Sequence, residues 1–483
     1  MQVTVVEAAD APGGAVRSRE DTLPGFVHDT CSGFYPLTAA SPAMRALPLE
    51  RLGVEWIDPP VPMAHPFPDG SAIALHRDVD ATAASLDSQA PGAGAAWREQ
   101  VELLRPHREL LFRTVLSPFP PVTAAVRLGL RLRRAGIALA RQGLSSAAAL
   151  GLELFGNERA AAWLAGSAAH SDLSPGAAVG GALALGLGVL GNLVGWPFPR
   201  GGAQRLTDAL VARLRELGGE VRCNTAVESV ALRRGRATGV RMATGEELAA
   251  DVVVATVSAG VVARLVPDGV LPKLVERRLR NWRYGLGTFK VDLALDGPVP
   301  WLAEEARRAG VVHVAGELES LFRTAHEARA GEVPAEPTLV VGQHTLYDPT
   351  RAPDGRHTLY VYTHVPQRPP LDDAEISERI EQRIEDFAPG FRQLVAARAV
   401  RGPEALEREN ASLVGGDLGG GSYELDQQLL FRPAIELVRG RTPLRGLYVA
   451  GASVHPGGGV HGVSGAAAAR AVIEDSSPIR PWR

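Results

Sequence analysis

A short hydrophobic strand that ends in an acid is the first part of this chain with a chemical signature. The strand over residues 3–6 runs into Glu7, Gly13-Gly14 follow six residues later, and Arg17 lies just beyond. An acid that ends the second strand of a dinucleotide-binding fold hydrogen-bonds the hydroxyls of an adenosine ribose. Paired glycines let the backbone approach a pyrophosphate, to which Arg17 can add a charge-assisted bond. The alternative is a surface strand with an ordinary turn.

A second segment, from Pro199 to Thr256, predicts a helix followed by several strands. Residues 205–217 carry leucines at helical spacing, and Gly218-Gly219 end this helix. Strands are predicted over 220–224, 225–232, 237–242 and 250–256. This alternation fits a three-layer nucleotide-binding domain, in which the strand edge at Val227 would hydrogen-bond an adenine. A purely structural α/β unit is the alternative.

A third segment near the end of the chain, residues 446–472, reads GLYVAGASVHPGGGVHGVSGAAAARAV. It predicts a buried strand over 444–450, a glycine loop and a helix of small residues over 460–473. The N-terminus of a helix offers free N–H groups and a partial positive charge, which suit anionic or electron-rich ligand atoms. The small residues would let a flat ring pack against the backbone. A plain glycine turn is the alternative.

Together the three segments resemble the FAD-dependent phytoene dehydrogenase-like oxidoreductases of the carotenoid desaturase and amine oxidase superfamily. The resemblance runs from the first residues to nearly the last and includes YGLGTFKVD at 284–292. Its nearest branch is the pyridine nucleotide-disulfide oxidoreductase domain-containing protein 2 type. The resemblance implies an α/β fold, in which a Rossmann-like FAD-binding domain is interleaved with an α+β substrate domain.

The resemblance also implies roles for the residues of the three segments. Glu7 would bind the adenosine ribose of FAD, and the backbone of Val227 would hold the adenine. The pyrophosphate, the ribityl chain and the flavin ring would contact the remaining predicted cofactor-binding residues, which are Gly13, Gly14, Arg17, Gly451, Ala452, Gly458, Gly459 and Val460. A helix N-terminus at the flavin ring would stabilise the anionic reduced flavin.

One departure from the family concerns the start of the sequence. The family begins with a strand and a G-x-G-x-x-G turn that cradles the pyrophosphate, and this sequence lacks both. Gly13-Gly14 cannot replace that turn, because they follow the second strand. We expect roughly 30 further residues, the size of one such unit, to precede Met1 in the intact protein. The alternative is a protein that has lost firm FAD binding.

The implied chain path passes repeatedly between two domains. The FAD-binding domain would comprise residues 1–75, with its first βα unit missing, residues 201–260 and residues 426–483. The substrate domain would comprise the largely helical residues 76–200 and residues 261–425.

Composition narrows the range of functions. The 483 residues include 51 Lys+Arg and 54 Asp+Glu, and the net charge of -3 argues against a nucleic-acid partner. Cys31 and Cys223 are the two cysteines and cannot form a disulfide framework or a zinc site alone, so no metal is predicted. No secretory signal peptide is apparent, and a cytoplasmic location is expected.

Two apolar stretches suggest how a hydrophobic substrate would be handled. Residues 173–199 carry no charge but many glycines, so we expect a buried or cavity-lining helix, with membrane contact as the alternative. Residues 126–142 mix five arginines with apolar residues. A solvated basic helix face and a membrane-surface helix both fit this pattern. We expect the first stretch to line a cavity and the second to lie near its mouth.

The sequence offers few candidates for catalytic side chains. His455 and His461 flank the glycine loop, but a loop histidine is more often structural. His170 lies in a sequence suited to a turn, and packing roles are expected for Asp29 and Cys31. No catalytic acid or base is therefore predicted.

The sequence favours an FAD-dependent oxidoreductase that takes a hydride from a hydrophobic substrate, with carotenoid- and lipid-like molecules as candidates. Weak peripheral membrane association is expected, and the oligomeric state is left open. A flavin amine oxidase is the first alternative, which an aromatic cage around the flavin would favour. A flavin-free binding or assembly protein on the same fold is the second.

Overall fold

A mixed seven-stranded sheet is the largest element of the computed structural model, which describes residues 1–477. All neighbouring strands are antiparallel except β14 and β5. In spatial order they are β17 (Val395–Arg401), β13 (Gly287–Leu295), β16 (His357–Val365), β15 (Leu339–Gly342), β14 (Val311–Val314), β5 (Met63–Pro66) and β6 (Ala72–Leu75).

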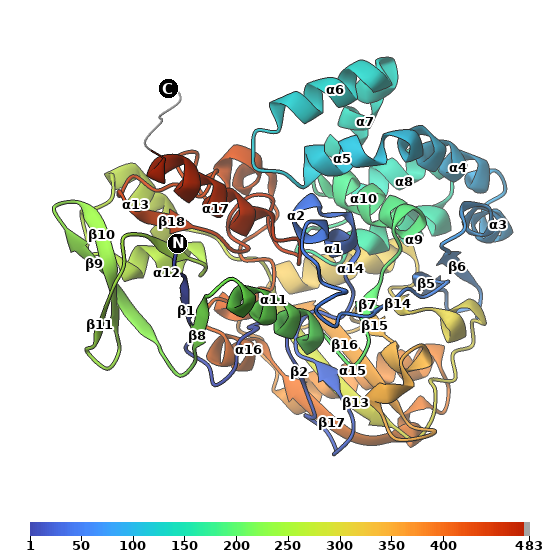
Figure 1. Cartoon of the computed structure of the whole chain (residues 1–483). Coiled ribbons are helices and arrows are strands. Elements are labelled where there is room, and N and C mark those ends of the chain that lie inside the picture. Colours follow the sequence, from blue (N-terminus) through green and yellow to red (C-terminus); the bar gives the residue numbers. More distant parts are fainter. Residues whose placement is uncertain (478–483) are drawn as a thin grey trace.

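The two faces of this sheet pack against different partners. Because side chains alternate along a strand, Leu359 and Val361 of β16 join one apolar cluster while Tyr360 and Tyr362 join another. The first cluster includes Ile380 of α15 (Asp373–Phe387), which covers one face. The second cluster joins the opposite face to a group of helices (Figure 1).

These helices occupy one end of the molecule (Figure 1). They are α3 (Val79–Gln89), α4 (Ala93–Leu104), α5 (Arg108–Val115), α6 (Val122–Leu132), α7 (Arg134–Leu144), α8 (Ala147–Phe155), α9 (Glu158–Ala168) and α10 (Gly180–Leu193). Glycines let α10 pack very closely. A Cβ on Gly188 would lie 2.7 Å from the Trp97 ring, and one on Gly191 would overlap Leu75.

The nucleotide-binding side contains short parallel strands and a three-stranded antiparallel sheet. Strands β1 (Thr4–Val6) and β8 (Glu220–Arg222) form one parallel pair, and β12 (Val253–Ala255) and β18 (Leu447–Val449) form another. The antiparallel sheet holds β9 (Val227–Arg233), β10 (Arg236–Met242) and β11 (Glu247–Ala249). Helices on this side include α11 (Gln204–Glu216), α12 (Ala259–Leu265), α13 (Lys273–Arg280) and α17 (Val463–Ser476).

Shorter elements connect the two sides. Strands β2 (Ser18–Arg19) and β3 (His28–Asp29) pair with each other, as do β4 (Trp56–Ile57) and β7 (Phe198–Pro199). The connecting helices are α1 (Pro36–Ala40), α2 (Pro42–Arg45), α14 (Leu318–Arg329) and α16 (Pro403–Glu409).

The α/β class is confirmed, and two details of the predicted organisation need correction. Strands β5 and β6 fall within predicted segment 1–75 but pair with the substrate-domain strands, because β14 supplies the hydrogen-bonding partner of β5. Residues 126–142 form parts of two helices, because the chain turns at Arg133, where φ is 51°. The other domain boundaries and the further unit before Met1 stay predictions.

Membrane crossing by a helix finds no support in the described part of the chain. None of the helices within residues 1–477 is both long and apolar enough to span a bilayer. The uncharged stretch at 173–199 contains the 14-residue helix α10, which is buried.

Candidate functional site

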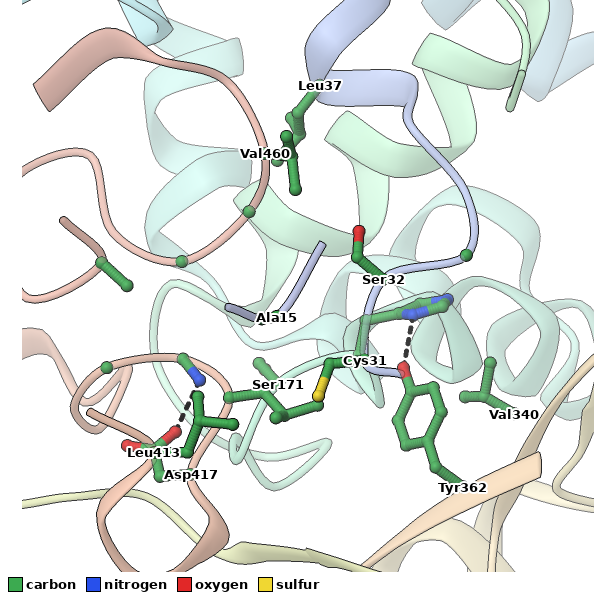
Figure 2. A pocket seen from close by; sticks show the side chains of 18 of the residues that line it. Ala15, Cys31, Ser32, Leu37, Ser171, Val340, Tyr362, Leu413, Asp417 and Val460 are labelled. Atoms are coloured by element: carbon green, nitrogen blue, oxygen red, sulfur yellow. Dashed lines mark hydrogen bonds between the residues drawn. The ribbon is translucent and has the colours of Figure 1, made fainter. Parts of the chain in front are cut away.

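A cavity of about 420 Å³ lies between the nucleotide-binding side and the large sheet (Figure 2). Two of its walls are the segments that follow the parallel strands: residues 256–258 after β12 and residues 452–453 after β18. In open α/β sheets, ligands bind outside the carboxyl ends of the strands. The cavity therefore lies where the fold predicts a ligand.

The glycine loop before α17 forms a third wall of the cavity. Gly458, Gly459 and Val460 all line it. A Cβ on Gly459, where φ is +112°, would approach Leu37 to 2.6 Å, so a larger residue would displace the cavity wall. The hydroxyl of Thr38 donates to the carbonyl of Val460, which fixes the loop against α1.

The structure places the predicted cofactor-binding residues in two groups. Ala452, Gly458, Gly459 and Val460 line the cavity. The residues that do not line it are Glu7, Gly13, Gly14, Arg17, Val227 and Gly451. Gly451 is adjacent to the lining residue Ala452, and its N–H donates to Ser464 in the first turn of α17 over 3.1 Å.

The predicted adenosine-binding residues come together away from the cavity. The N–H of Thr225 donates to the carbonyl of Glu7 over 2.8 Å, two residues before Val227 begins β9. The Glu7 carboxylate accepts the N–H of Ala9 over 2.8 Å. An acid at the end of β1 and the first strand of the antiparallel sheet are thus neighbours.

The segment from Gly13 to Arg17 turns between these two places. Gly13 and Gly14 both have positive φ, at 127° and 53°, and Ala15 lines the cavity. Arg17 donates to Asp10 over 3.1 Å. This segment therefore links the Glu7 region with the cavity, and Arg17 engages an exposed carboxylate.

The opposite half of the cavity is formed by the large sheet and α10. Val311, Val340 and Tyr362 line it from β14, β15 and β16, and Leu183 and Leu187 line it from α10. This agrees with the expectation that residues 173–199 line a cavity. The aromatic lining residues are Phe34, Tyr35, Trp196, Tyr360, Tyr362 and Tyr423.

A chain of polar side chains at this end was not predicted from the sequence. Nδ1 of His170 lies 2.8 Å from the Tyr362 hydroxyl, and Nε2 lies 2.9 Å from Nε2 of His313 (the first contact is drawn in Figure 2). Burial lowers the pKa of His170 to about 4 and lowers the pKa of His313 well below its usual value. The only sequence signal was the alternation of Tyr360, Tyr362 and His364 along one strand.

The two histidines that flank the glycine loop do not line the cavity. Nε2 of His461 lies 3.1 Å from the carbonyl of Gly457, and Nδ1 accepts the N–H of Val463 over 3.1 Å. His455 is buried and packs edge-on against Phe119. His461 is thus fully engaged in holding the loop, and His455 packs on Phe119 outside the cavity lining.

Cys31 and Asp29 differ in their relation to the cavity. Cys31 lines it, and burial raises the pKa of its thiol to about 12, so the thiol stays protonated at neutral pH. Asp29 is buried behind the cavity in an ion pair with Arg351 over 2.7 Å. Among residues 1–477, no cluster of three or more His, Cys, Asp or Glu is arranged to hold a metal ion.

A sequence profile of flavin-containing amine oxidoreductases matches residues 1–473. The chain belongs to this family. FAD is the cofactor that members of the family bind, which agrees with the predicted cofactor and with an oxidoreductase.

Curated relatives of this chain include animal and bacterial proteins. A mouse pyridine nucleotide-disulfide oxidoreductase domain-containing protein 2 is 30% identical over 313 residues, which is 59% of this chain and 53% of the mouse protein. A neurosporene-forming phytoene desaturase of Rhodobacter capsulatus is 28% identical over 302 residues, 58% of this chain and 54% of the desaturase. The chain thus spans about half the length of these relatives.

Solved structures of oxidoreductases share the fold. An oxidoreductase from Methanosarcina mazei aligns with a TM-score of 0.62 and 16% identity, covering 98% of this chain and 94% of that protein. Putrescine oxidase bound to putrescine aligns with a TM-score of 0.60 and 16% identity, covering 98% and 93%. At this identity the likeness shows the fold alone.

The residues around the cavity fit a flavin. The carboxyl ends of β12 and β18, the glycine loop and Ala15 present backbone and small side chains to the cavity, as a flat ring would need. Only glycine fits at position 459 without displacing Leu37. The acid at the end of β1 supplies a group suited to ribose hydroxyls, although it lies outside the cavity.

The buried, neutral state of His170 predicts a pH effect on stability. Below pH 6.5 the unfolded histidine takes up a proton that the folded one resists down to about pH 4, so the free energy of unfolding falls as pH decreases. Between pH 7 and pH 5 the free energy of unfolding of His170→Gln should therefore fall by about 2 kcal/mol less than that of the wild type.

Urea unfolding of both proteins at the two pH values measures this difference. His326→Gln is the control, because His326 is exposed on α14, and it should behave as the wild type does. An identical loss of stability in His170→Gln and the wild type would show that His170 takes up a proton without unfolding.

Proposed function

We propose that this protein is an FAD-dependent oxidoreductase that dehydrogenates a hydrophobic substrate, with carotenoid- and lipid-like molecules as the candidate class. One observation carries the proposal: a single cavity joins the carboxyl ends of β12 and β18 to an apolar wall built by the large sheet and α10. FAD, when bound, would accept a hydride from the substrate.

The residues of the chain mainly hold and orient the substrate. Leu183 and Leu187 on one side and Val311 and Val340 on the other would exclude water and hold an apolar substrate against the glycine loop. Hydride removal from carbon needs this alignment more than it needs a side-chain base, which agrees with a cavity in which burial lowers the pKa of both lining histidines, His170 and His364.

A flavin amine oxidase is the second candidate, and the aromatic lining of the cavity favours it. The two carboxylates that line the cavity, however, already use much of their hydrogen-bonding capacity within the protein. Asp172 accepts the Ser422 hydroxyl over 2.6 Å and the N–H of Tyr423 over 2.8 Å. Asp417 accepts three backbone N–H groups, from Gly285, Gly419 and Gly421. Both carboxylates are thus engaged by the protein itself.

Anaerobic reduction of the flavin-loaded protein separates these candidates. Phytoene in detergent micelles should bleach the visible absorbance of the oxidised flavin, and putrescine or benzylamine should not. Val340→Trp, which would fill the apolar wall, should slow bleaching by phytoene about tenfold or more, because a 1 Å misplacement already costs about a hundredfold. Bleaching by an amine alone would establish the amine oxidase instead.

Glu7 offers a test of FAD binding that does not depend on the substrate. Glu7→Gln should weaken FAD binding to the apoprotein by about 1.5–3 kcal/mol, because a charged acceptor for two ribose hydroxyls is replaced by a neutral one. Fluorescence titration with FAD measures the dissociation constant.

The control variant for this titration is Glu246→Gln, which changes an exposed acid in the β10–β11 hairpin. An unchanged dissociation constant in Glu7→Gln would show that Glu7 does not bind FAD. Failure of the wild type to bind FAD would favour the flavin-free binding protein.

We also propose weak peripheral membrane association through the α6–α7 hairpin. Its outer surface exposes Val122, Val126, Leu130 and Ile137, the last two at 74% each. Exposed arginines at 127, 131, 133 and 134 accompany them. Helices with apolar and basic side chains in this arrangement bind anionic membrane surfaces. The hairpin projects from one end of the molecule (Figure 1).

The hairpin is tied to the cavity walls at both ends. Gly143 of α7 packs on Ala182 of α10, and Phe119, just before α6, packs on His455 beside the glycine loop. A substrate taken up at this surface would therefore be close to the elements that build the cavity.

Vesicle flotation tests the membrane proposal. The protein should float with vesicles containing phosphatidylglycerol at low salt, remain unbound with pure phosphatidylcholine, and be released at high salt because screening weakens attraction of the arginines. Leu130→Asp should abolish flotation. Leu217→Asp, which alters a residue of similar exposure after α11, should not. Equal flotation of both variants would contradict the role of the hairpin.

A further inference from the structure

Two tyrosines of β16 line the same end of the cavity but differ in how their hydroxyl groups are used. Tyr360 and Tyr362 are two residues apart, so they point to the same face of the sheet, and their rings pack edge-on with centroids 5.9 Å apart. The hydroxyl of Tyr360 donates to the carbonyl of Cys31 over 2.8 Å. Its one hydrogen is therefore committed to the protein.

The hydroxyl of Tyr362 belongs to a chain of buried groups. It lies 2.8 Å from Nδ1 of His170, whose Nε2 lies 2.9 Å from Nε2 of His313. Among the described residues, Nδ1 of His313 is buried without a hydrogen-bond partner. Both histidines are neutral at pH 7, because burial lowers their pKa values. Each ring therefore carries one N–H.

The unpartnered nitrogen decides the direction of this chain. If Tyr362 donated to His170, then His170 would donate to His313, and the remaining N–H would sit on buried Nδ1 with no acceptor. In the opposite direction His313 donates to His170, His170 donates to Tyr362, and Nδ1 of His313 holds only a lone pair. Buried N–H groups without an acceptor are the rarer and costlier case. The second direction therefore prevails.

We propose that Tyr362 is a hydrogen-bond donor directed into the cavity, so that among apolar molecules the site prefers those that carry a neutral carbonyl or hydroxyl oxygen. The hydroxyl oxygen of Tyr362 accepts from His170, so its own hydrogen is available to a ligand. This inference rests on the proposed function, because both concern the same cavity.

The surroundings of Tyr362 support a neutral, largely apolar ligand. Val340 and the α10 leucines Leu183 and Leu187 supply apolar contacts in the same cavity. The charged side chains of the lining are Asp172 and Asp417, and both are satisfied by donors of the protein. Figure 2 shows Tyr362 and Val460 on different sides of the cavity, so a ligand oxygen at Tyr362 would orient the rest of the molecule toward the glycine loop.

A matched pair of probes tests the donor. α-Tetralone and tetralin share a two-ring frame and differ in one carbonyl oxygen, and calorimetric titration of the flavin-loaded protein gives both dissociation constants. Tyr362→Phe should weaken binding of α-tetralone about 5–10-fold and change that of tetralin less than about 2-fold, as expected for loss of one hydrogen bond. Tyr360→Phe is the matched control: it removes a lining hydroxyl whose hydrogen is already given to Cys31, so it should change the two constants by the same factor.

Several results would overturn the proposal. These are an equal loss of affinity for both probes in Tyr362→Phe, no loss for α-tetralone, the same selective loss for α-tetralone in Tyr360→Phe, or no binding of either probe to the wild type. Tyr362→Leu removes the same hydroxyl and serves as a second variant if Tyr362→Phe does not fold. Failure of the proposed function would instead appear as flavin that no apolar substrate bleaches, whatever the probes do.

Discussion

The ion pair between Arg351 and Asp29 holds together the segments on which the cavity depends. Arg351 is 1% exposed and donates to Asp29 over 2.7 Å, to Asp348 over 3.0 Å and to the carbonyl of Pro199 over 2.8 Å. Asp29 also accepts the N–H of Ala203 over 2.8 Å, just before α11. The ion pair thus joins β3, the end of β7 and a helix start. Loss of Arg351 would leave the buried Asp29 carboxylate without its counter-charge, which is strongly destabilising.

The ion pair between Arg351 and Asp29 also positions one wall of the cavity. The wall from Cys31 to Leu37 begins two residues after Asp29 and reaches the glycine loop at Leu37. Backbone and small residues surround the cavity on the nucleotide-binding side, whereas the large sheet presents aliphatic, aromatic and polar side chains. The first side suits a ligand shared by a whole family. The second side carries the groups that would distinguish one substrate from another.

Local sequence patterns predicted the elements but not their long-range pairing. The helix predicted over 205–217 is present as α11 over Gln204–Glu216, because leucines at helical spacing and a pair of glycines at the end are local signals. Strands β5 and β6 carry no signal for the sheet they join, since β14 lies far along the chain. The break at Arg133 also lacked a signal, because neither Pro nor Gly occupies that position.

The candidate site shows the same division between local and long-range information. The glycine loop was predicted because a strand, small residues and a helix follow one another in the chain. His170 and Tyr362 are 192 residues apart, and nothing in their neighbourhoods indicates that they meet. A structural role for His461 agrees with the sequence analysis, but its partners could not be predicted, because they are backbone groups of the loop.

The close packing of α10 constrains how this cavity can diverge. Gly188 and Gly191 already bring the helix into contact with Trp97 and Leu75, so the helix cannot move outward without repacking the layer behind it. Val311, Val340 and Tyr362 lie on paired strands of the sheet. Their positions do not depend on a close approach of the kind that α10 makes to Trp97 and Leu75. Evolution toward a larger or smaller ligand would therefore proceed by substitutions on the sheet, while the backbone of α10 remains a fixed wall of the cavity.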